Sequence, residues 1–197
     1  MDTLDAVRAR RSIGRLAAPG PEGDDLQAIL EAGACAPDHG ELRPFRFTLL
    51  RGEGMDAFGE LIERAYLTRC AAEGVEPDPQ RALKERTKLT RAPLVVAVSY
   101  VHRASDKIPA TDQRDAAAAA AQNLLLAATA LGYGSMWRTG KVCDDEGVRA
   151  AIGLGPDDAL IGFLYLGTVA PEAAKPPRQP DLDGLVVEWT PPGTPSD

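Results

Sequence analysis

The order of apolar and polar residues along the chain predicts four strands. Leu94–Val98 and Leu160–Thr168 are apolar runs of strand length, which is typical of strands covered on both faces of a sheet. Phe45–Leu50 alternates between apolar and polar residues, with both aromatic rings on one side, and predicts a strand whose other face is less apolar. A short strand is also expected over Ser135–Arg138. The pattern therefore predicts a sheet with fully buried central members.

Apolar residues at helical spacing fill the stretches between these strands. Asp2 is expected to cap the first helix, and Asp24 or Asp25 the second, because a side-chain carboxylate can accept a free backbone N–H there. Helices are expected over about 2–10, 24–36, 54–73, 80–91, 111–131 and 145–152. Their expected inward-facing residues in the first half of the chain are Leu4, Val7, Leu26, Ile29, Leu30, Gly33, Met55, Phe58, Leu61, Ile62 and Tyr66.

Two segments indicate contacts beyond ordinary packing. The helix over 111–131 carries the run Ala116–Ala121, whose small side chains let another backbone approach closely, either in the core or from a second subunit. Seven of the sixteen prolines fall after residue 170, which excludes a packed helix there. That tail still contains the strand-like Leu185–Trp189, which needs a sheet edge of its own subunit or of a second one.

Helices and strands mix with few βαβ units, so the sequence predicts an α+β fold and not a doubly wound sheet. No internal repeat and no domain boundary is visible, and 197 residues suffice for one core. Residues 1–197 are therefore expected to form a single domain that ends in a proline-rich arm over 171–197.

Composition narrows the function classes. A formal net charge of -7 argues against binding to nucleic acid or to anionic membranes. No apolar run reaches the length of a membrane span, and no signal peptide is visible. The three widely spaced cysteines form neither a disulfide framework nor a metal pattern, which favours the reducing cytoplasm. His39 and His102 have no partner at metal-ligand spacing, so no metal site is predicted.

Arginines are concentrated at the N-terminus of this acidic chain. Arg8, Arg10, Arg11 and Arg15 face only two aspartates in the first fifteen residues. An arginine fork suits a phosphate, because its planar donors can bond two oxygens at once. The alternative is that these arginines stabilise the dipole of the first helix at its C-terminal end.

A second basic run lies over 81–91, with five cations and one glutamate. At helical spacing such a run is typical of a solvated helix face. A site for the 2'-phosphate of NADPH is the alternative.

No familiar catalytic motif is present. Gly132-x-Gly134 follows a helix, and Trp137 occupies the third glycine position of a dinucleotide fingerprint, so the pair predicts a helix end. The segments Ala36–His39 and Trp137–Gly140 instead suit a planar phosphorylated cofactor, since they offer stiff corners, a ring and a close-approaching glycine. The alternative is a turn role for His39 and a core role for Trp137.

In their order and spacing these pieces resemble the FMN-dependent nitroreductase family, and most closely its small, compact YdjA-type branch. The resemblance covers nearly the whole chain. It is carried by Arg10-Arg11-Ser12, Leu26–Gly33, Ala36-Pro37-Asp38-His39, Arg43–Phe47, Gln122–Ala128, Leu131–Gly134, Trp137–Gly140 and Gly162–Gly167.

The resemblance implies an antiparallel or mixed sheet flanked by helices, in an intertwined homodimer with FMN at the subunit interface and the C-terminal arm in the dimer contact. Arg10, Arg11 and Ser12 would contact the phosphate and ribityl chain. Pro37, Asp38 and His39 would face the flavin of the other subunit. Trp137, Arg138 and Thr139 would lie beside the ring, and Ala128 near the nicotinamide.

Two corners depart from the larger nitroreductases. Arg43-Pro44-Phe45 stands where those enzymes carry Gln-Pro-Trp, and Asp38-His39 stands where they carry a serine pair. Many members also have a lysine near flavin N1, where this chain has Gly14.

The basic contacts of the larger members are altered too. Arg15 or Arg138 is expected to replace the missing lysine. Lys175 and Arg178 lie in the region of the C-terminal phosphate contact of those enzymes, but they match its pattern poorly.

The activity implied is ping-pong hydride transfer from NAD(P)H through FMN to a small oxidised acceptor, nitroaromatic or quinone-like. No side chain is predicted as an acid or base catalyst, because the flavin supplies the chemistry. The alternatives are a flavin-binding protein without efficient turnover, and a flavoenzyme of the same fold that reduces enones or removes halogens. The sequence decides neither the acceptor nor the choice between NADH and NADPH.

Overall fold

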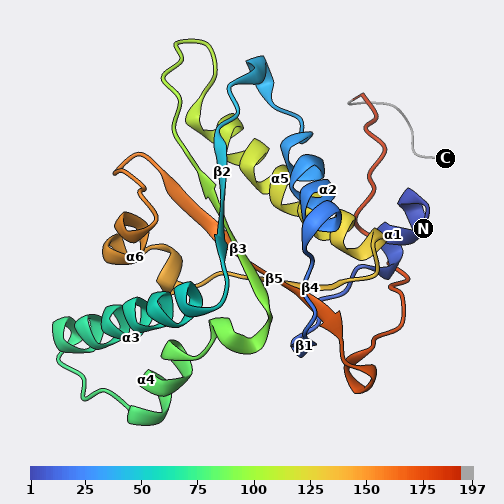
Figure 1. Cartoon of the computed structure of the whole chain (residues 1–197). Coiled ribbons are helices and arrows are strands. Elements are labelled where there is room, and N and C mark those ends of the chain that lie inside the picture. Colours follow the sequence, from blue (N-terminus) through green and yellow to red (C-terminus); the bar gives the residue numbers. More distant parts are fainter. Residues whose placement is uncertain (192–197) are drawn as a thin grey trace.

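An antiparallel sheet of five strands runs through the centre of the molecule (Figure 1). The computed structural model describes residues 1–191 of the chain. The strands are β1 (Leu16–Ala17), β2 (Phe45–Leu50), β3 (Leu94–Tyr100), β4 (Gly134–Arg138) and β5 (Ala159–Val169). β3 lies between β2 and β5, while β4 and β1 pair with the other side of β5. The α+β fold and the four expected strands are confirmed, and only the two-residue β1 was missed.

Helices cover both faces of this sheet (Figure 1). They are α1 (Thr3–Ala9), α2 (Gly23–Ala34), α3 (Glu53–Glu73), α4 (Pro79–Arg86), α5 (Ala110–Ala130) and α6 (Glu146–Ala151), with short 3-10 turns η1 (His39–Glu41), η2 (Leu89–Arg91), η3 (Lys141–Cys143) and η4 (Pro171–Ala173). α2 and α5 pack on one face, and α3 packs with α4 and α6 on the other. Every residue of β3 is buried between these layers, as its apolar run predicts.

Small residues let α5 pack closely against the sheet and α2. Ala117, Ala120 and Ala121 are fully buried, so much of the alanine run serves the core of its own chain. A Cβ on Gly33 of α2 would lie 2.8 Å from a methyl carbon of Leu124. Since that distance is shorter than any normal contact, the packing of α2 on α5 requires glycine at this position.

The first helix is capped as expected but faces the other way. Asp2 accepts a hydrogen bond from the backbone N–H of Asp5 at 2.9 Å. Leu4 and Val7, expected to face inward, are 63% and 49% exposed, and Ala6 is the buried residue. The helix α1 has only two turns and packs against α5 with the small side chain of Ala6, so it buries little of its apolar surface. The inward prediction for Leu4 and Val7 is therefore wrong for the single chain.

The second helix begins one residue before the expected caps. Its N-cap is Glu22, whose side chain makes no capping bond, while Asp24 and Asp25 lie in the first turn. Both carboxylates there favour the helix dipole. Asp25 also accepts a hydrogen bond from the Tyr133 hydroxyl at 2.7 Å, and this bond raises the pKa of Tyr133. The two aspartates thus stabilise α2 without capping it.

The proline-rich tail leaves the sheet after β5 and runs past α1 (Figure 1). The expected strand over Leu185–Trp189 does not form on the sheet of its own chain, because these residues have no strand partner among residues 1–191. Their apolar side chains are strongly exposed, up to 85% at Val187. Pairing with a sheet edge of the same subunit is therefore wrong, and pairing with a second subunit stays a prediction.

Candidate functional site

The segment that follows α1 lies alongside the start of β4. Ser12 forms a parallel bridge with Ser135, and the Ile13 N–H donates to the Ser135 carbonyl at 2.9 Å. The buried Ile13 side chain anchors the segment. The fold therefore brings Arg10, Arg11 and Ser12 to one end of the strand that carries Trp137 and Arg138, although more than a hundred residues separate them in the sequence.

The tail adds basic residues to the same place. The Lys175 ammonium donates to the Ser12 carbonyl at 2.8 Å, and the Arg178 N–H donates to the Arg8 carbonyl at 3.0 Å. Within residues 1–191, no carboxylate lies at ion-pair distance from Arg8, Arg10, Arg11, Arg15 or Lys175. Cations that share a place without an acidic partner are suited to bind an anion.

Two of these cations, Arg11 and Lys175, border a hollow of about 300 Å³. We call it the N-terminal hollow; its lining includes Arg11, Ile13, Thr129, Tyr133, Ser135 and Lys175. The Ser135 hydroxyl is buried and has no hydrogen-bond partner among the described residues. An unpartnered buried hydroxyl costs free energy unless a bound group satisfies it. A phosphate or a ribityl hydroxyl fits both this hydroxyl and the adjacent cations.

Trp137 packs toward the α2 and α5 side of the sheet. Its indole N–H donates to the Ile161 carbonyl at 3.3 Å. A Cβ on Gly162 of β5 would lie 2.3 Å from the indole nitrogen, and the φ of Gly162 is +153°. Glycine is therefore required at 162 for the ring of Trp137 to lie against β5.

Arg138 turns to the opposite face of the sheet. Its guanidinium lies 5.8 Å from the centre of the Tyr165 ring, and its Nε is buried without a hydrogen-bond partner among the described residues. Burial raises the pKa of Tyr165 to about 12, although the charges of Arg138 and Arg91 oppose the shift. Tyr165 therefore stays neutral and offers Arg138 the face of its ring.

The turn after β4 is open to solvent. Thr139 and Gly140 are exposed, and Gly140 has a φ of +122° that favours glycine. A Cβ at Gly140 would meet no atom within 4 Å, so there is free space beside this backbone. A planar ligand can approach the turn closely there.

Pro37, Asp38 and His39 lie at the other end of α5 from α1 (Figure 1). Asp38 accepts a hydrogen bond from the Arg43 N–H, and His39 lies 3.8 Å from the Asp112 carboxylate. A helix of 21 residues spans about 30 Å, so one chain does not bring this corner to Arg10–Ser12. A role at a cofactor for these three residues needs a second subunit.

Ala128 is fully buried between α5 and the sheet, and its carbonyl accepts the Tyr133 N–H at 2.8 Å. Its methyl group is therefore out of reach of a ligand in the single chain. Ser135 and Tyr165 were not singled out by the sequence analysis. The strands that carry them could be predicted from the sequence, but the pairing of β4 with β5 could not.

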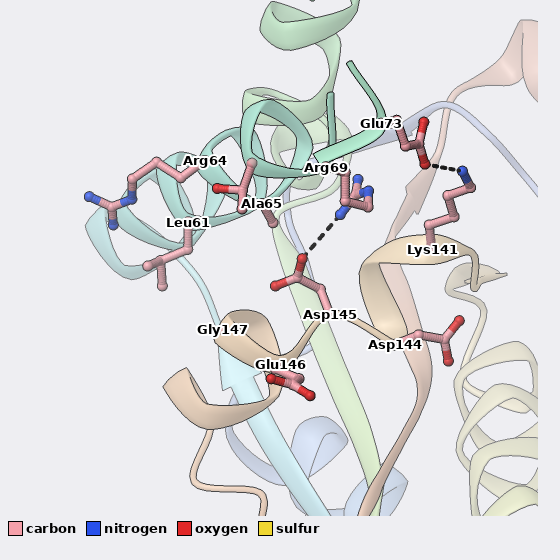
Figure 2. Close-up of a pocket in the computed structure, with 11 residues that line it drawn as sticks. Leu61, Arg64, Ala65, Arg69, Glu73, Lys141, Asp144, Asp145, Glu146 and Gly147 are labelled. Atoms are coloured by element: carbon pink, nitrogen blue, oxygen red, sulfur yellow. Dashed lines mark hydrogen bonds and ion pairs between the residues drawn. The ribbon is translucent and has the colours of Figure 1, made fainter. Parts of the chain in front are cut away.

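A larger hollow, about 750 Å³, lies between α3, η3 and α6 (Figure 2). Figure 2 shows Arg69 and Asp145 facing one another, with N–O distance 3.1 Å, and Lys141 paired with Glu73 at 3.3 Å. Asp145 also caps α6 by accepting the Val148 N–H. These charges already have partners within the chain, so size alone does not make this hollow the site.

The part of the chain that the structure describes contains no group of three or more histidine, cysteine, aspartate or glutamate side chains placed to hold a metal ion. None of its helices has the length and apolar character needed to cross a membrane.

Known proteins match this chain along nearly its whole length. YdjA of Escherichia coli (strain K12), a candidate NAD(P)H nitroreductase by name, is 36% identical over 187 residues, or 95% of this chain and 99% of YdjA. A nitroreductase with bound FMN from Bacteroides fragilis NCTC 9343 is 28% identical, with a TM-score of 0.71 over 96% of this chain and all of that one.

A nitroreductase-like protein from Bacillus cereus has the same fold, with a TM-score of 0.78 and 19% identity over 96% of both chains. The model of the Nitroreductase family matches residues 7–168, which contain the N-terminal arginines, β4 and the turn after it. The chain therefore belongs to the nitroreductase family of oxidoreductases.

Proposed function

We propose that this protein is an FMN-dependent oxidoreductase that takes NAD(P)H and a small oxidised acceptor, nitroaromatic or quinone-like, in turn at one place. The names of its relatives support the nicotinamide substrate, and the FMN-bound relative at 28% identity supports the cofactor. Bound FMN would supply the hydride chemistry, and the chain would supply binding, orientation and electrostatics.

One observation carries the proposal: cations without acidic partners gather beside an unpartnered hydroxyl. Arg10 and Arg11 would hold the FMN phosphate through charge-assisted hydrogen bonds, and Ser12 and Ser135 would bond phosphate or ribityl oxygens. Lys175, held at the Ser12 carbonyl, would neutralise the second phosphate charge.

The other end of β4 would position the ring. The Trp137 ring lies against Gly162, and its indole N–H donates to the Ile161 carbonyl, so it would form a fixed wall of the flavin site. The Gly140 N–H would donate to the edge of the flavin ring. Arg138 is stacked on Tyr165 and is therefore less available to the flavin. Arg15 lies beside Gly14 in an open hollow of about 460 Å³, so it is the better replacement for the family lysine. A cation there would stabilise negative charge on a reduced ring.

The site would be completed by a second copy of the chain. Pro37, Asp38 and His39 of one subunit would border the FMN held by the other, which accounts for their distance from Arg10. The dimer contact would be formed by Leu185–Trp189 and by apolar side chains that one chain leaves exposed. These exposed side chains are Leu4 and Val7 on α1, Leu131 after α5 and Leu182 in the tail.

The cytoplasm is the compartment we infer. Cys35, Cys70 and Cys143 are all free thiols, and a reducing compartment keeps such thiols unpaired. Burial raises the pKa of Cys143 to about 11, so this thiol stays protonated at neutral pH.

The first test is the visible spectrum of the purified protein, followed by anaerobic addition of NADPH or NADH. We expect flavin absorption that is lost on addition of a reduced nicotinamide nucleotide. Flavin absorption that neither nucleotide removes would favour a flavin-binding protein without turnover. A protein that stays colourless after FMN is supplied would contradict the proposal as a whole.

A further inference from the structure

A second basic hollow adjoins the exposed turn after β4. It has a volume of about 330 Å³ and lies between α3, α4 and η3, with Thr139 and Gly140 in its wall. We call it the α4 groove. Its charged lining residues are Arg69, Arg81, Lys88 and Lys141, against Glu73 and Glu85. Arg69 pairs with Asp145 at 3.1 Å, and the remaining three cations against two carboxylates leave the groove basic on a chain whose net charge is -7.

Arg81 is the cation in the α4 groove best prepared for a ligand. Its guanidinium lies 5.5 Å from the centre of the Tyr66 ring, and no carboxylate among residues 1–191 pairs with it. The Tyr66 hydroxyl accepts the Asp78 N–H at 3.1 Å, which fixes the ring against the start of α4. Stacking orients the guanidinium but leaves its N–H edge free for oxygen acceptors.

Lys88 and Lys141 can also add positive charge to the groove. Lys88 pairs with Glu85 at 2.7 Å and neutralises it inside the groove. The Lys141–Glu73 pair in Figure 2 is exposed, with 72% and 55% of the two side chains accessible. Exposed pairs contribute at most about 1 kcal/mol, so Lys141 can turn from Glu73 to a better acceptor at small cost.

We propose that the α4 groove binds the 2'-phosphate of NADPH, with Arg81 as the main contact and Lys141 as the second. The inference rests on the proposed function, which sets the flavin ring at the turn of Thr139 and Gly140 and so brings the nicotinamide that reduces it to this turn. The adenosine end of the dinucleotide extends away from that ring, and this groove begins at the turn. A phosphate monoester carries about two charges at neutral pH and suits an arginine fork. The enzyme therefore prefers NADPH to NADH.

Binding of 2',5'-ADP to the FMN-loaded protein, measured by isothermal titration calorimetry, tests the groove without turnover. We expect 2',5'-ADP to bind about tenfold more tightly than 5'-AMP, and Arg81→Ala to remove this difference. Lys84→Ala is the matched control, because Lys84 lies on the same helix but does not line the groove. Equal binding of the two nucleotides, or an unchanged preference in Arg81→Ala, would overturn the inference.

Steady-state rates separate this inference from the proposed function. We expect kcat/KM for NADPH to fall about tenfold in Arg81→Ala through KM, with kcat and the NADH rates unchanged. If the parent protein and Arg81→Ala both show equal kcat/KM for NADPH and NADH, the NADPH site would be overturned and the proposed function would stand. If neither nucleotide reduced the flavin while 2',5'-ADP still bound through Arg81, the proposed function would fail and the site would stand.

Discussion

Two stretches of this acidic chain are equally basic in sequence and differ in the structure. The arginines at positions 8–15 have no acidic partner within residues 1–191. In the run over 81–91, Arg86 pairs with Glu60 at 2.7 Å and also contacts Glu63, and Lys88 pairs with Glu85. Arg86 fastens α4 to α3, whereas Lys88 and Glu85 pair within the second stretch itself.

A basic run in the sequence therefore indicates a bound ligand only where the fold brings no carboxylate close enough to pair with its cations. The expectation of a solvated face over 81–91 agrees with the exposure of most of its side chains. Arg81, Lys84 and Arg91 have no ion pair within residues 1–191, and of these three only Arg81 lines the α4 groove. At positions 8–15 the fold adds Lys175 and a buried unpartnered hydroxyl, and within residues 1–191 it brings no carboxylate to ion-pair distance. The two stretches should therefore respond differently to matched changes.

The largest effect is expected from Gly162→Ala. The new Cβ would lie 2.3 Å from the Trp137 indole nitrogen and 2.8 Å from the Arg138 carbonyl, so β4 must shift. We expect the free energy of unfolding to fall by about 2–4 kcal/mol, with FMN binding weakened as well. Urea unfolding and FMN titration measure the two effects. Gly54→Ala is the control, since its Cβ meets nothing within 4 Å.

Gly59→Ala, on α3, is the corresponding lesion beside the second stretch. Its Cβ would meet the Arg86 carbonyl at 2.1 Å and push α4 from α3. We expect a loss of unfolding free energy of about 1–3 kcal/mol, but unchanged FMN affinity of the folded fraction. A loss of FMN affinity as large as that of Gly162→Ala would break the distinction between the two regions.

Lys175→Ala should weaken FMN without harming the fold. The side chain is exposed and donates to the Ser12 carbonyl, so its removal takes one charge from the phosphate site. We expect FMN to bind about tenfold more weakly, which corresponds to about 1.4 kcal/mol. The preference for FMN over riboflavin, measured by fluorescence titration, should shrink in the same proportion. An unchanged preference would remove the tail from the site.

The smallest effect is expected from Arg86→Ala. Arg86 is about half exposed, as is Glu60, so their pair contributes at most about 1 kcal/mol. We expect a slightly lower unfolding midpoint, less so at high salt because exposed charges are screened, and no change in FMN affinity. A tenfold loss of FMN affinity would show that this stretch also serves the cofactor.

Local patterns predicted the sheet well, because the buried strands β3 and β5 are apolar throughout and need no partner to be recognised. The segment at Arg10–Ser12 could be singled out from its charge alone. The orientation of α1 could not, since the exposure of Leu4 and Val7 depends on what covers a short helix. Lys175 and Ser135 also escaped notice as partners of Ser12, because contacts between distant segments leave no periodic signal.

We propose that the unpaired N-terminal arginines hold the FMN phosphate. The direct measurement is the Kd of FMN and of riboflavin for the apoprotein, for Arg10→Ala/Arg11→Ala and for the control Lys84→Ala/Arg86→Ala. We expect the first double variant to bind FMN about 100-fold more weakly and riboflavin equally well, and the control to bind both as before. FMN affinity that survives the loss of both N-terminal arginines would contradict the account.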